Sequence, residues 1–269
     1  MPPRSSKPNV LTIAGSDSGG GAGIQADLKT FAAHGLHGLS AIAALTAQNT
    51  RVVTSVHVPP AAFLRAQIDA CFDDFKIGAV KIGMLANARI IHAVADALEH
   101  YRPKHIVLDP VMVASSGAKL LAANALDALR TRLIPLATTI TPNIPEAELL
   151  IGHAIGRADE AKAALVKLRA LGANAVLLKG GHLKGRVMID RLDDGRQLLE
   201  FVHPRLNIEG HGTGCTLASA ITACLCQGMP LTTACAAATD YVHGALVNAY
   251  RPGKGKVAVL DHFWQARQH

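Results

Sequence analysis

Short, almost wholly apolar segments alternate along this chain with longer segments of helical periodicity, and this alternation limits the available folds. The expected strands are NVLTIAG (9–15), LSAIAALTA (39–47), VVTSVHV (52–58), AVKIGML (79–85), HIVLDPVMV (105–113), TTITPN (138–143) and AVLLKGG (175–181). The expected helices are 23–34, 60–72, 87–99, 124–133, 145–151, 157–171, 214–227 and 231–250. Apolar strands separated by helices predict a mostly parallel sheet covered on both faces, which is a three-layer, doubly wound α/β fold. The DDG sequence within 187–202 predicts a small β-hairpin.

The length and the termini are consistent with one domain. The chain has 269 residues and no Ser/Pro-rich linker, so we expect a single domain over 9–269 after a disordered tail over 1–8. The tail lacks the apolar core of a secretion signal. No uninterrupted apolar run approaches the ~18 residues of a membrane span. We therefore expect a cytoplasmic protein.

Charge and cysteine usage narrow the class of ligand. The 27 basic and 20 acidic residues give a net charge of +7, but the basic residues are dispersed and aromatic residues make up only 4%. Because a single-strand nucleic-acid binder needs stacking rings between its cations, we favour a positively biased cleft for small anions. The five cysteines include no CxxC pair, and the thirteen histidines include no HExxH. A disulfide framework and a zinc site are therefore both disfavoured.

The first glycine-rich loop is GSDSGGGAGIQADLKT (15–30). Gly21, Gly23 and Ala26 satisfy the dinucleotide pattern GxGxxA, which requires an acidic residue ~20 positions later. No Asp or Glu lies between Asp27 and Asp69, which disfavours a nicotinamide-dependent dehydrogenase. The P-loop pattern GxxxxGK[ST] does not occur. The loop is then either a tight turn or a glycine nest whose amides approach a ligand.

The second loop is EGHGTGCTLASA (209–220), where glycines precede an apolar helix. The amides of Gly212, Thr213 and Gly214, together with the helix dipole, predict an anion site. The same field would lower the pKa of Cys215. Cys215 could equally be a small buried residue, and the sequence leaves both interpretations open.

Polar residues at the ends of the apolar strands are further candidates, because ligands of parallel sheets gather at the carboxyl ends of the strands. Asn143 and Glu146 are spaced as a helix capping box, or Glu146 holds a metal-bound water. Asp109, before a proline, is a turn residue or a magnesium-facing carboxylate. Lys179, after an apolar strand, needs a partner, and a phosphate is a suitable one. The other polar or special residues at strand ends are Asp17, Gln48, Asn49, Gly83 and Met84.

Seven segments in order resemble one known family. They are AGSDSGGGAGIQADLKTF, TAQNT, KIGML, LDPVMVASSG, TPNIPEAELL, LKGGH and HGTGCT. Together they resemble the hydroxymethylpyrimidine/phosphomethylpyrimidine kinases of thiamine biosynthesis, in the ribokinase-like superfamily, from about residue 9 to about residue 250. Pyridoxal kinases are close relatives of that family.

The resemblance implies ATP-dependent phosphorylation of a hydroxymethyl aminopyrimidine and then of its monophosphate, with Mg²⁺ as cofactor, in a homodimer. It implies a substrate pocket made by Asp27, Gln48, Gly15, Gly83, Met84 and Val111, although Met84 could be ordinary core packing. It implies ATP binding by Asn143, Lys179 and Thr213, and metal organisation by Asp109 and Glu146, through water in the case of Glu146. Gly212, Gly214 and Cys215 would form the catalytic anion hole with Lys179.

Two departures from related sequences affect these implied roles. Sugar kinases of the wider superfamily carry an aspartate base where Cys215 stands, so the base here would be a thiolate or would be dispensable. Many relatives read Pro-Ser where this chain has Ser18–Gly19.

We expect two hollows of main-chain amides to face each other, one for the alcohol and one for the nucleotide's phosphates, with 114–119 as a candidate lid. The alternatives are a pyridoxal kinase and a non-catalytic nucleotide or RNA binder.

Overall fold

The computed structural model describes residues 7–113 and 120–267. The candidate lid, 114–119, and residues 1–6 of the expected tail lie outside the described residues. Within that tail, the carbonyl of Pro8 accepts a hydrogen bond of 3.0 Å from the amide of His37. The chain is therefore already tied to the sheet one residue before the first strand.

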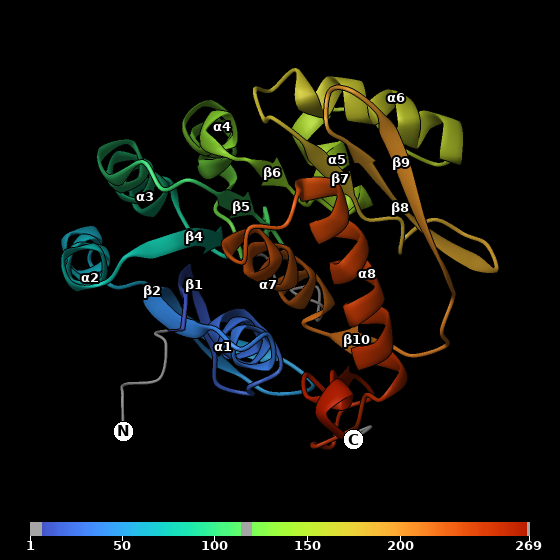
Figure 1. Ribbon diagram of the computed structural model, residues 1–269, viewed down its shortest axis with the longest axis horizontal. Coiled ribbons are helices and arrows are strands. Elements are labelled where there is room, and N and C mark those ends of the chain that lie inside the picture. The colour runs from blue at the N-terminus through green and yellow to red at the C-terminus, as the bar shows by residue number, and fades with distance from the viewer. Residues whose placement is uncertain (1–6, 114–119, 268–269) are drawn as a thin grey trace.

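A nine-stranded sheet runs through the molecule in the order β3-β2-β1-β4-β5-β6-β7-β8-β9 (Figure 1). Its strands are β1 (Asn9–Asp17), β2 (His37–Gln48), β3 (Val53–His57), β4 (Ile77–Ile82), β5 (Ile106–Leu108), β6 (Thr139–Ile140), β7 (Val176–Leu178), β8 (Val187–Asp193) and β9 (Leu198–Pro204). A separate pair joins β10 (Gly210–His211) to β11 (Ala258–Val259).

The six central strands, β2, β1, β4, β5, β6 and β7, run parallel to one another. At the two edges of the sheet, β3 pairs antiparallel with β2, and the β8–β9 hairpin pairs antiparallel with β7. The hairpin reverses at Gly195, which has φ +84°, and the Asp193 carboxylate accepts a hydrogen bond from its amide. The predicted mostly parallel sheet and the predicted hairpin are both confirmed.

Helices cover both faces of the sheet (Figure 1). They are α1 (Gly23–Ala33), α2 (Ala61–Asp74), α3 (Ala88–Tyr101), α4 (Leu126–Ala128), α5 (Ile144–Ile151), α6 (Ala158–Arg169), α7 (Thr213–Cys226) and α8 (Leu231–Val247). Alternate residues of one strand serve the two layers: Leu108 packs in the core with α2 to α6, and Val107 packs with α7 and α8. Residues that alternate in this way must be apolar at every position, which explains the uninterrupted apolar runs of the sequence.

The structure departs from the predicted elements mainly in length. The helix predicted over 124–133 is broken into a 3₁₀ turn (Ala123–Ala125), the short α4, a π-helical turn (Leu129–Leu133) and a second 3₁₀ turn (Ile134–Leu136) that contains Pro135. The expected strands over 105–113, 138–143 and 175–181 are only two or three residues long. In the first two, Pro110 and Pro142 follow the strand closely and cannot donate to the ladder.

The carboxyl ends of the parallel strands all lie along one side of the sheet, which we call its carboxyl edge, and α1 and α7 both begin there. This edge carries Asp17, Gln48, Asp109 and Lys179, each at the end of a strand or directly after it. Over the described ranges, no helix is both long enough and apolar enough to cross a membrane.

Candidate active site

A cavity of about 570 Å³ opens at the carboxyl edge of the sheet. It contains most of the residues singled out from the sequence, namely Gly15, Gln48, Met84, Asp109, Val111, Asn143, Glu146, Lys179, Gly212, Thr213, Gly214 and Cys215. The parallel strands bring these residues together from positions spread over most of the chain. Asp27 and Gly83 are absent from the lining of this cavity.

A buried cation between two carboxylates lies on one side of the cavity. Lys179 Nζ is 2.8 Å from Asp109 Oδ1 and 3.8 Å from Glu146 Oε2. Burial alone would lower the pKa of Lys179, but the two carboxylates outweigh it and raise that pKa, so the amine is charged. Burial raises the pKa of Glu146 to about 7, against the opposing effect of Lys179. The predicted need of Lys179 for a partner is met within the chain by these carboxylates.

Asn143 and Glu146 form the predicted capping box at the start of α5. The Asn143 side chain accepts a hydrogen bond of 2.9 Å from the Glu146 amide, and Glu146 Oε2 accepts one of 2.8 Å from the Asn143 amide. The same Glu146 carboxylate faces Lys179 in the cavity. The capping interpretation is confirmed, and the box also holds Glu146 in place; its metal role stays a prediction.

The second glycine loop lies over the Lys179–Asp109 pair. Gly212 has φ +84° and is the N-cap residue of α7, where it makes no side-chain cap hydrogen bond. A Cβ atom at Gly214 would lie 3.0 Å from Lys179 Nζ and 3.4 Å from Asp109 Oδ2. The start of α7 is therefore in direct proximity to a buried cation, an arrangement that suits a bound anion.

Cys215 does not have the lowered pKa predicted from its place at the start of α7. Burial raises the pKa of the Cys215 thiol to about 11, although Lys81 and the Gly23 amide act in the opposite direction. The prediction was wrong because it counted the field of the helix and left out the cost of desolvating a thiolate. The side chain is a protonated thiol at neutral pH in this structure.

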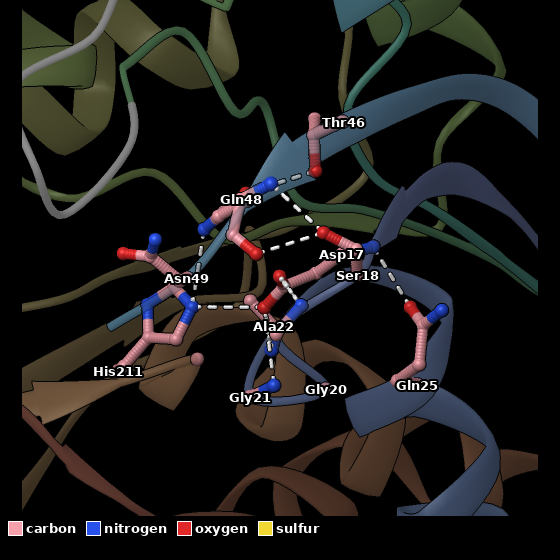
Figure 2. Close-up of polar contacts among 12 residues, drawn as sticks. Asp17, Ser18, Gly20, Gly21, Ala22, Gln25, Thr46, Gln48, Asn49 and His211 are labelled. Atoms are coloured by element: carbon pink, nitrogen blue, oxygen red, sulfur yellow. Dashed lines mark hydrogen bonds and ion pairs between the residues drawn. The ribbon is translucent and has the colours of Figure 1, made fainter. Parts of the chain in front are cut away.

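The first glycine loop is not the open nest that was predicted. The carboxylate of Asp17 fills it and accepts hydrogen bonds from the amides of Gly19 (2.7 Å), Gly21 (3.1 Å) and Ala22 (2.9 Å) (Figure 2). The expectation of two open hollows is wrong for this loop, because a side chain of the chain itself takes the position of an anionic ligand. The second loop also lines the cavity, and its N-cap residue, Gly212, makes no side-chain cap hydrogen bond.

His211 joins the two loops, and the sequence analysis did not identify it. Its Nε2 lies 2.9 Å from Asp17 Oδ2 and 3.2 Å from Gln48 Nε2 (Figure 2). The backbones also touch here, because a Cβ atom at Gly212 would overlap the carbonyl oxygen of Gly21. The available signal was the position of His211 within the second glycine loop, directly before Gly212.

Asp27 is enclosed in the core and not placed in the cavity. Its carboxylate accepts hydrogen bonds from Thr12 (2.6 Å), Ser219 (2.7 Å) and Lys81 (2.9 Å), and its side chain has no exposed surface. The implied contact between Asp27 and a substrate therefore has no support in this structure. Lys81, which does line the cavity, was missed although it carries the same signal as Lys179, a lysine within an apolar strand.

The glycines and the methionine of the implied substrate pocket behave differently from one another. A Cβ atom at Gly83 would lie 2.8 Å from Lys81 Nζ, so Gly83 makes room for the buried lysine and does not line the cavity. Gly15 and Met84 both line the cavity, and a Cβ atom at Gly15 would lie 2.9 Å from Met84 Sδ. Met84 is 7% exposed, so it serves as core packing and as cavity wall together.

Comparisons with known proteins agree with this geometry. The family described as phosphomethylpyrimidine kinase matches residues 17–260. The chain is 49% identical to the hydroxymethylpyrimidine/phosphomethylpyrimidine kinase of Rhizobium meliloti, over 95% of this chain and 98% of that one. It is 51% identical to the thiamine biosynthesis bifunctional protein ThiED of Geobacter sulfurreducens, over 92% of this chain. The chain spans about half the length of that second relative, 51%.

Solved structures give the same result for the fold. The phosphomethylpyrimidine kinase of Clostridium difficile matches with a TM-score of 0.79 and 44% identity, over 88% of this chain and 98% of that one. The ADP complex of Bacillus subtilis pyridoxal kinase matches with a TM-score of 0.90 and 35% identity, over 97% and 99%. From the sheet order, the cavity and these matches, the chain belongs to the phosphomethylpyrimidine kinase family and has its ribokinase-like fold.

Proposed function

We propose that this protein transfers the γ-phosphoryl group of ATP to the alcohol of 4-amino-5-hydroxymethyl-2-methylpyrimidine, and then a second phosphoryl group to the resulting monophosphate, in thiamine biosynthesis. The observation that carries the proposal is the position of the uncapped start of α7 over the Lys179–Asp109 pair, inside a cavity of about 570 Å³. Family membership supports this choice of acceptor, and the geometry supports a binding site for the transferring phosphoryl group at the start of α7.

The phosphate side of the site works mainly through charge neutralisation and positioning, because the loose transition state of phosphoryl transfer requires little covalent chemistry from the protein. The amides of Gly212, Thr213 and Gly214 would donate to the equatorial oxygens of the moving group. Lys179 is held in place by Asp109 before ATP binds, so it need not reorganise when charge develops.

Asp109 and Glu146 fit a divalent cation, which we propose is Mg²⁺. Mg²⁺ is usually held by one or two carboxylates together with substrate phosphates and water. Both of these carboxylates line the cavity and lie beside Lys179. Among the residues that the structure describes there is no group of three or more His, Cys, Asp or Glu side chains suited to a metal. A site of two carboxylates completed by ATP agrees with that. The bound cation would neutralise charge on the phosphates. Loss of activity in excess chelator, restored by Mg²⁺, is expected; activity that persists in chelator would contradict it.

We propose that Cys215 contacts the acceptor alcohol without acting as a preformed thiolate base. The thiol is protonated at neutral pH, since burial raises its pKa to about 11. A loose transition state leaves the attacking hydroxyl protonated until late in the reaction, so an ionised base is dispensable. Cys215 then shapes the wall of the cavity between the two loops.

Acceptor-dependent release of ADP tests the proposal. Purified protein with ATP and Mg²⁺ should release ADP only when hydroxymethylpyrimidine is added. Nucleotide binding without acceptor-dependent ADP release would instead identify a non-catalytic nucleotide-binding protein.

A homodimer and a cytoplasmic location stay predictions. Sedimentation of the purified protein would test the first, and cell fractionation would test the second.

A second acceptor, pyridoxal, is favoured by one observation. The TM-score of 0.90 with a pyridoxal kinase exceeds the 0.79 found with the phosphomethylpyrimidine kinase structure, although the identity is lower. Separate measurements of kcat/KM for the two alcohols decide between them. We expect the aminopyrimidine to be preferred.

A further inference from the structure

We propose that Asp17 and His211 are positioning residues that set the orientation of the Gln48 side-chain amide, and through it the choice of acceptor ring. Oε1 of Gln48 accepts a hydrogen bond from His211, and Nε2 of Gln48 donates one to Thr46. This inference rests on the proposed function for its substrate, but the hydrogen-bond arrangement stands on contacts within the chain.

The arrangement begins with Asp17, whose carboxylate is an acceptor only. Three main-chain amides of the first glycine loop donate to it, as does His211 (Figure 2). Burial alone would raise the pKa of Asp17, but the hydrogen bond with His211 and those with the loop amides outweigh it and lower that pKa. Because Asp17 is ionised, the nitrogen of His211 that faces it, Nε2 at 2.9 Å, must carry a proton.

That proton restricts the neighbouring Gln48. As Figure 2 draws the amide, Nε2 of Gln48 lies 3.2 Å from the same Nε2 of His211. A protonated ring nitrogen cannot accept a hydrogen bond, so two donors would face each other. The oxygen and nitrogen of a side-chain amide have nearly the same shape, and their assignment follows from the hydrogen-bond network. Rotation of the amide by half a turn removes this clash, because Oε1 of Gln48 then faces the N–H of His211 and accepts its single proton as a second acceptor, shared with the carboxylate of Asp17.

Thr46 independently requires the same rotation. Its hydroxyl lies 3.0 Å from the carbonyl oxygen of Ser16, where it donates its single proton. The hydroxyl also lies 3.1 Å from the other end of the Gln48 amide. With its proton already used, Thr46 Oγ1 can only accept there, and the Gln48 atom beside it must be Nε2. Both neighbours of Gln48 therefore select one orientation.

In this orientation Gln48 keeps one N–H and one oxygen lone pair for a ligand in the cavity that it lines. An aminopyrimidine offers the complement, a ring nitrogen that accepts beside an amine that donates. A pyridoxal ring has no amine beside its ring nitrogen, so one of the two groups of Gln48 would lose its partner. Unmatched buried polar groups are the usual source of strong discrimination between similar ligands.

Kinetics of three variants test the inference. His211→Phe keeps a ring but removes the donor, and His211→Gln restores an N–H at a similar reach. His203→Phe is the matched control, because His203 makes a 2.9 Å contact with Asp240 outside the cavity. We expect His211→Phe to raise the KM for hydroxymethylpyrimidine at least ~5-fold, with the KM for ATP within about twofold and a smaller preference over pyridoxal. His211→Gln should lie between wild type and His211→Phe, and His203→Phe should match wild type. An unchanged acceptor KM in His211→Phe, or equal effects of the two Phe variants, overturns the inference.

A second measurement uses the wild-type protein alone, so it depends neither on enzymatic activity nor on whether a variant folds. Nitrogen NMR of the histidine rings in the wild-type protein reports which ring nitrogen carries the proton. We expect His211 to have a protonated Nε2 in the ligand-free protein; an unprotonated Nε2 overturns the arrangement. If the wild-type protein does not phosphorylate hydroxymethylpyrimidine at all, the proposed function fails, while the NMR result still decides the hydrogen-bond arrangement.

Discussion

Lys179 Nζ lies 2.8 Å from Asp109 Oδ1, across two parallel strand ends that are 70 positions apart in the chain. Both side chains are largely withdrawn from water, with 15% and 2% of their surfaces exposed. A buried ion pair of this kind contributes little net stability, because desolvation offsets most of the attraction. We propose that the pair instead holds a cation next to the start of α7, where a phosphoryl group of the substrate can bind it.

Replacement of Lys179 by Ala should remove that charge from the phosphate site. We expect kcat/KM for ATP to fall by about 10²-fold or more, the usual range for one stabilising donor of a transition state. Steady-state kinetics with varied ATP measure it. Lys162→Ala is the control, because Lys162 forms an exposed ion pair with Glu200 and neither residue lines the cavity. ATP dependence that is the same in wild type and in Lys179→Ala would remove Lys179 from the phosphate site.

Cys215→Ser should reduce kcat by less than ~10-fold, below the 10²–10⁴-fold range typical of a general base. The reason is the raised pKa of about 11, which leaves the thiol protonated at neutral pH. The pH profile of the wild-type kcat gives a second readout. If kcat increases tenfold for each pH unit up to that pKa, the thiolate is the active form, contrary to our proposal.

Asp27→Asn should destabilise the protein by about 3–5 kcal/mol, because the change leaves the fully buried Lys81 without its charged partner. Asp69→Asn is the matched control, since Asp69 pairs with Arg65 at the surface with 41% of its side chain exposed. Loss of that pair should cost less than ~1 kcal/mol. Urea unfolding of both variants compares the two costs. Equal midpoints would mean that the buried pair has no special role in stability.

Gly212→Ala should impair activity much more than a comparable change elsewhere. Gly212 has φ +84°, and its new Cβ would overlap the carbonyl oxygen of Gly21 where the two glycine loops touch. Gly228 has nearly the same angle, φ +88°, but no atom lies within 4 Å of a Cβ built there. Backbone strain alone therefore costs about 1 kcal/mol in both variants. We expect Gly212→Ala alone to lose kcat/KM by more than ~10-fold, as the anion loop is displaced. Similar kinetics for the two variants would argue that contact between the loops is unimportant.

The layers, the parallel sheet and the edge at which the cavity lies could all be predicted, because apolar periodicity and the common direction of parallel strands fix them. The residues placed at strand ends, such as Asp109 and Lys179, could be identified for the same reason. Sequence could not show that Asp17 occupies the first glycine loop, because a nest of amides accepts a carboxylate of the chain as readily as a ligand. Nor could it show the pKa of Cys215, which depends on burial by residues from several distant segments.

His211 and Lys81 illustrate the same limit from the opposite side. A histidine within a glycine loop is uninformative until the fold brings Asp17 within 2.9 Å of it, from 194 positions away. Lys81 lies within an apolar strand, and only the three-dimensional structure shows that α1 contributes its partner, Asp27. Pairings between distant segments carry this information, and local patterns do not contain it.

Mass detection of the products formed from hydroxymethylpyrimidine, ATP and Mg²⁺ tests the central claim most directly. The account predicts that the pyrimidine monophosphate appears first and that the diphosphate follows at its expense, with neither formed when ATP is omitted. A folded, ATP-binding protein that leaves the pyrimidine unmodified under these conditions would contradict it.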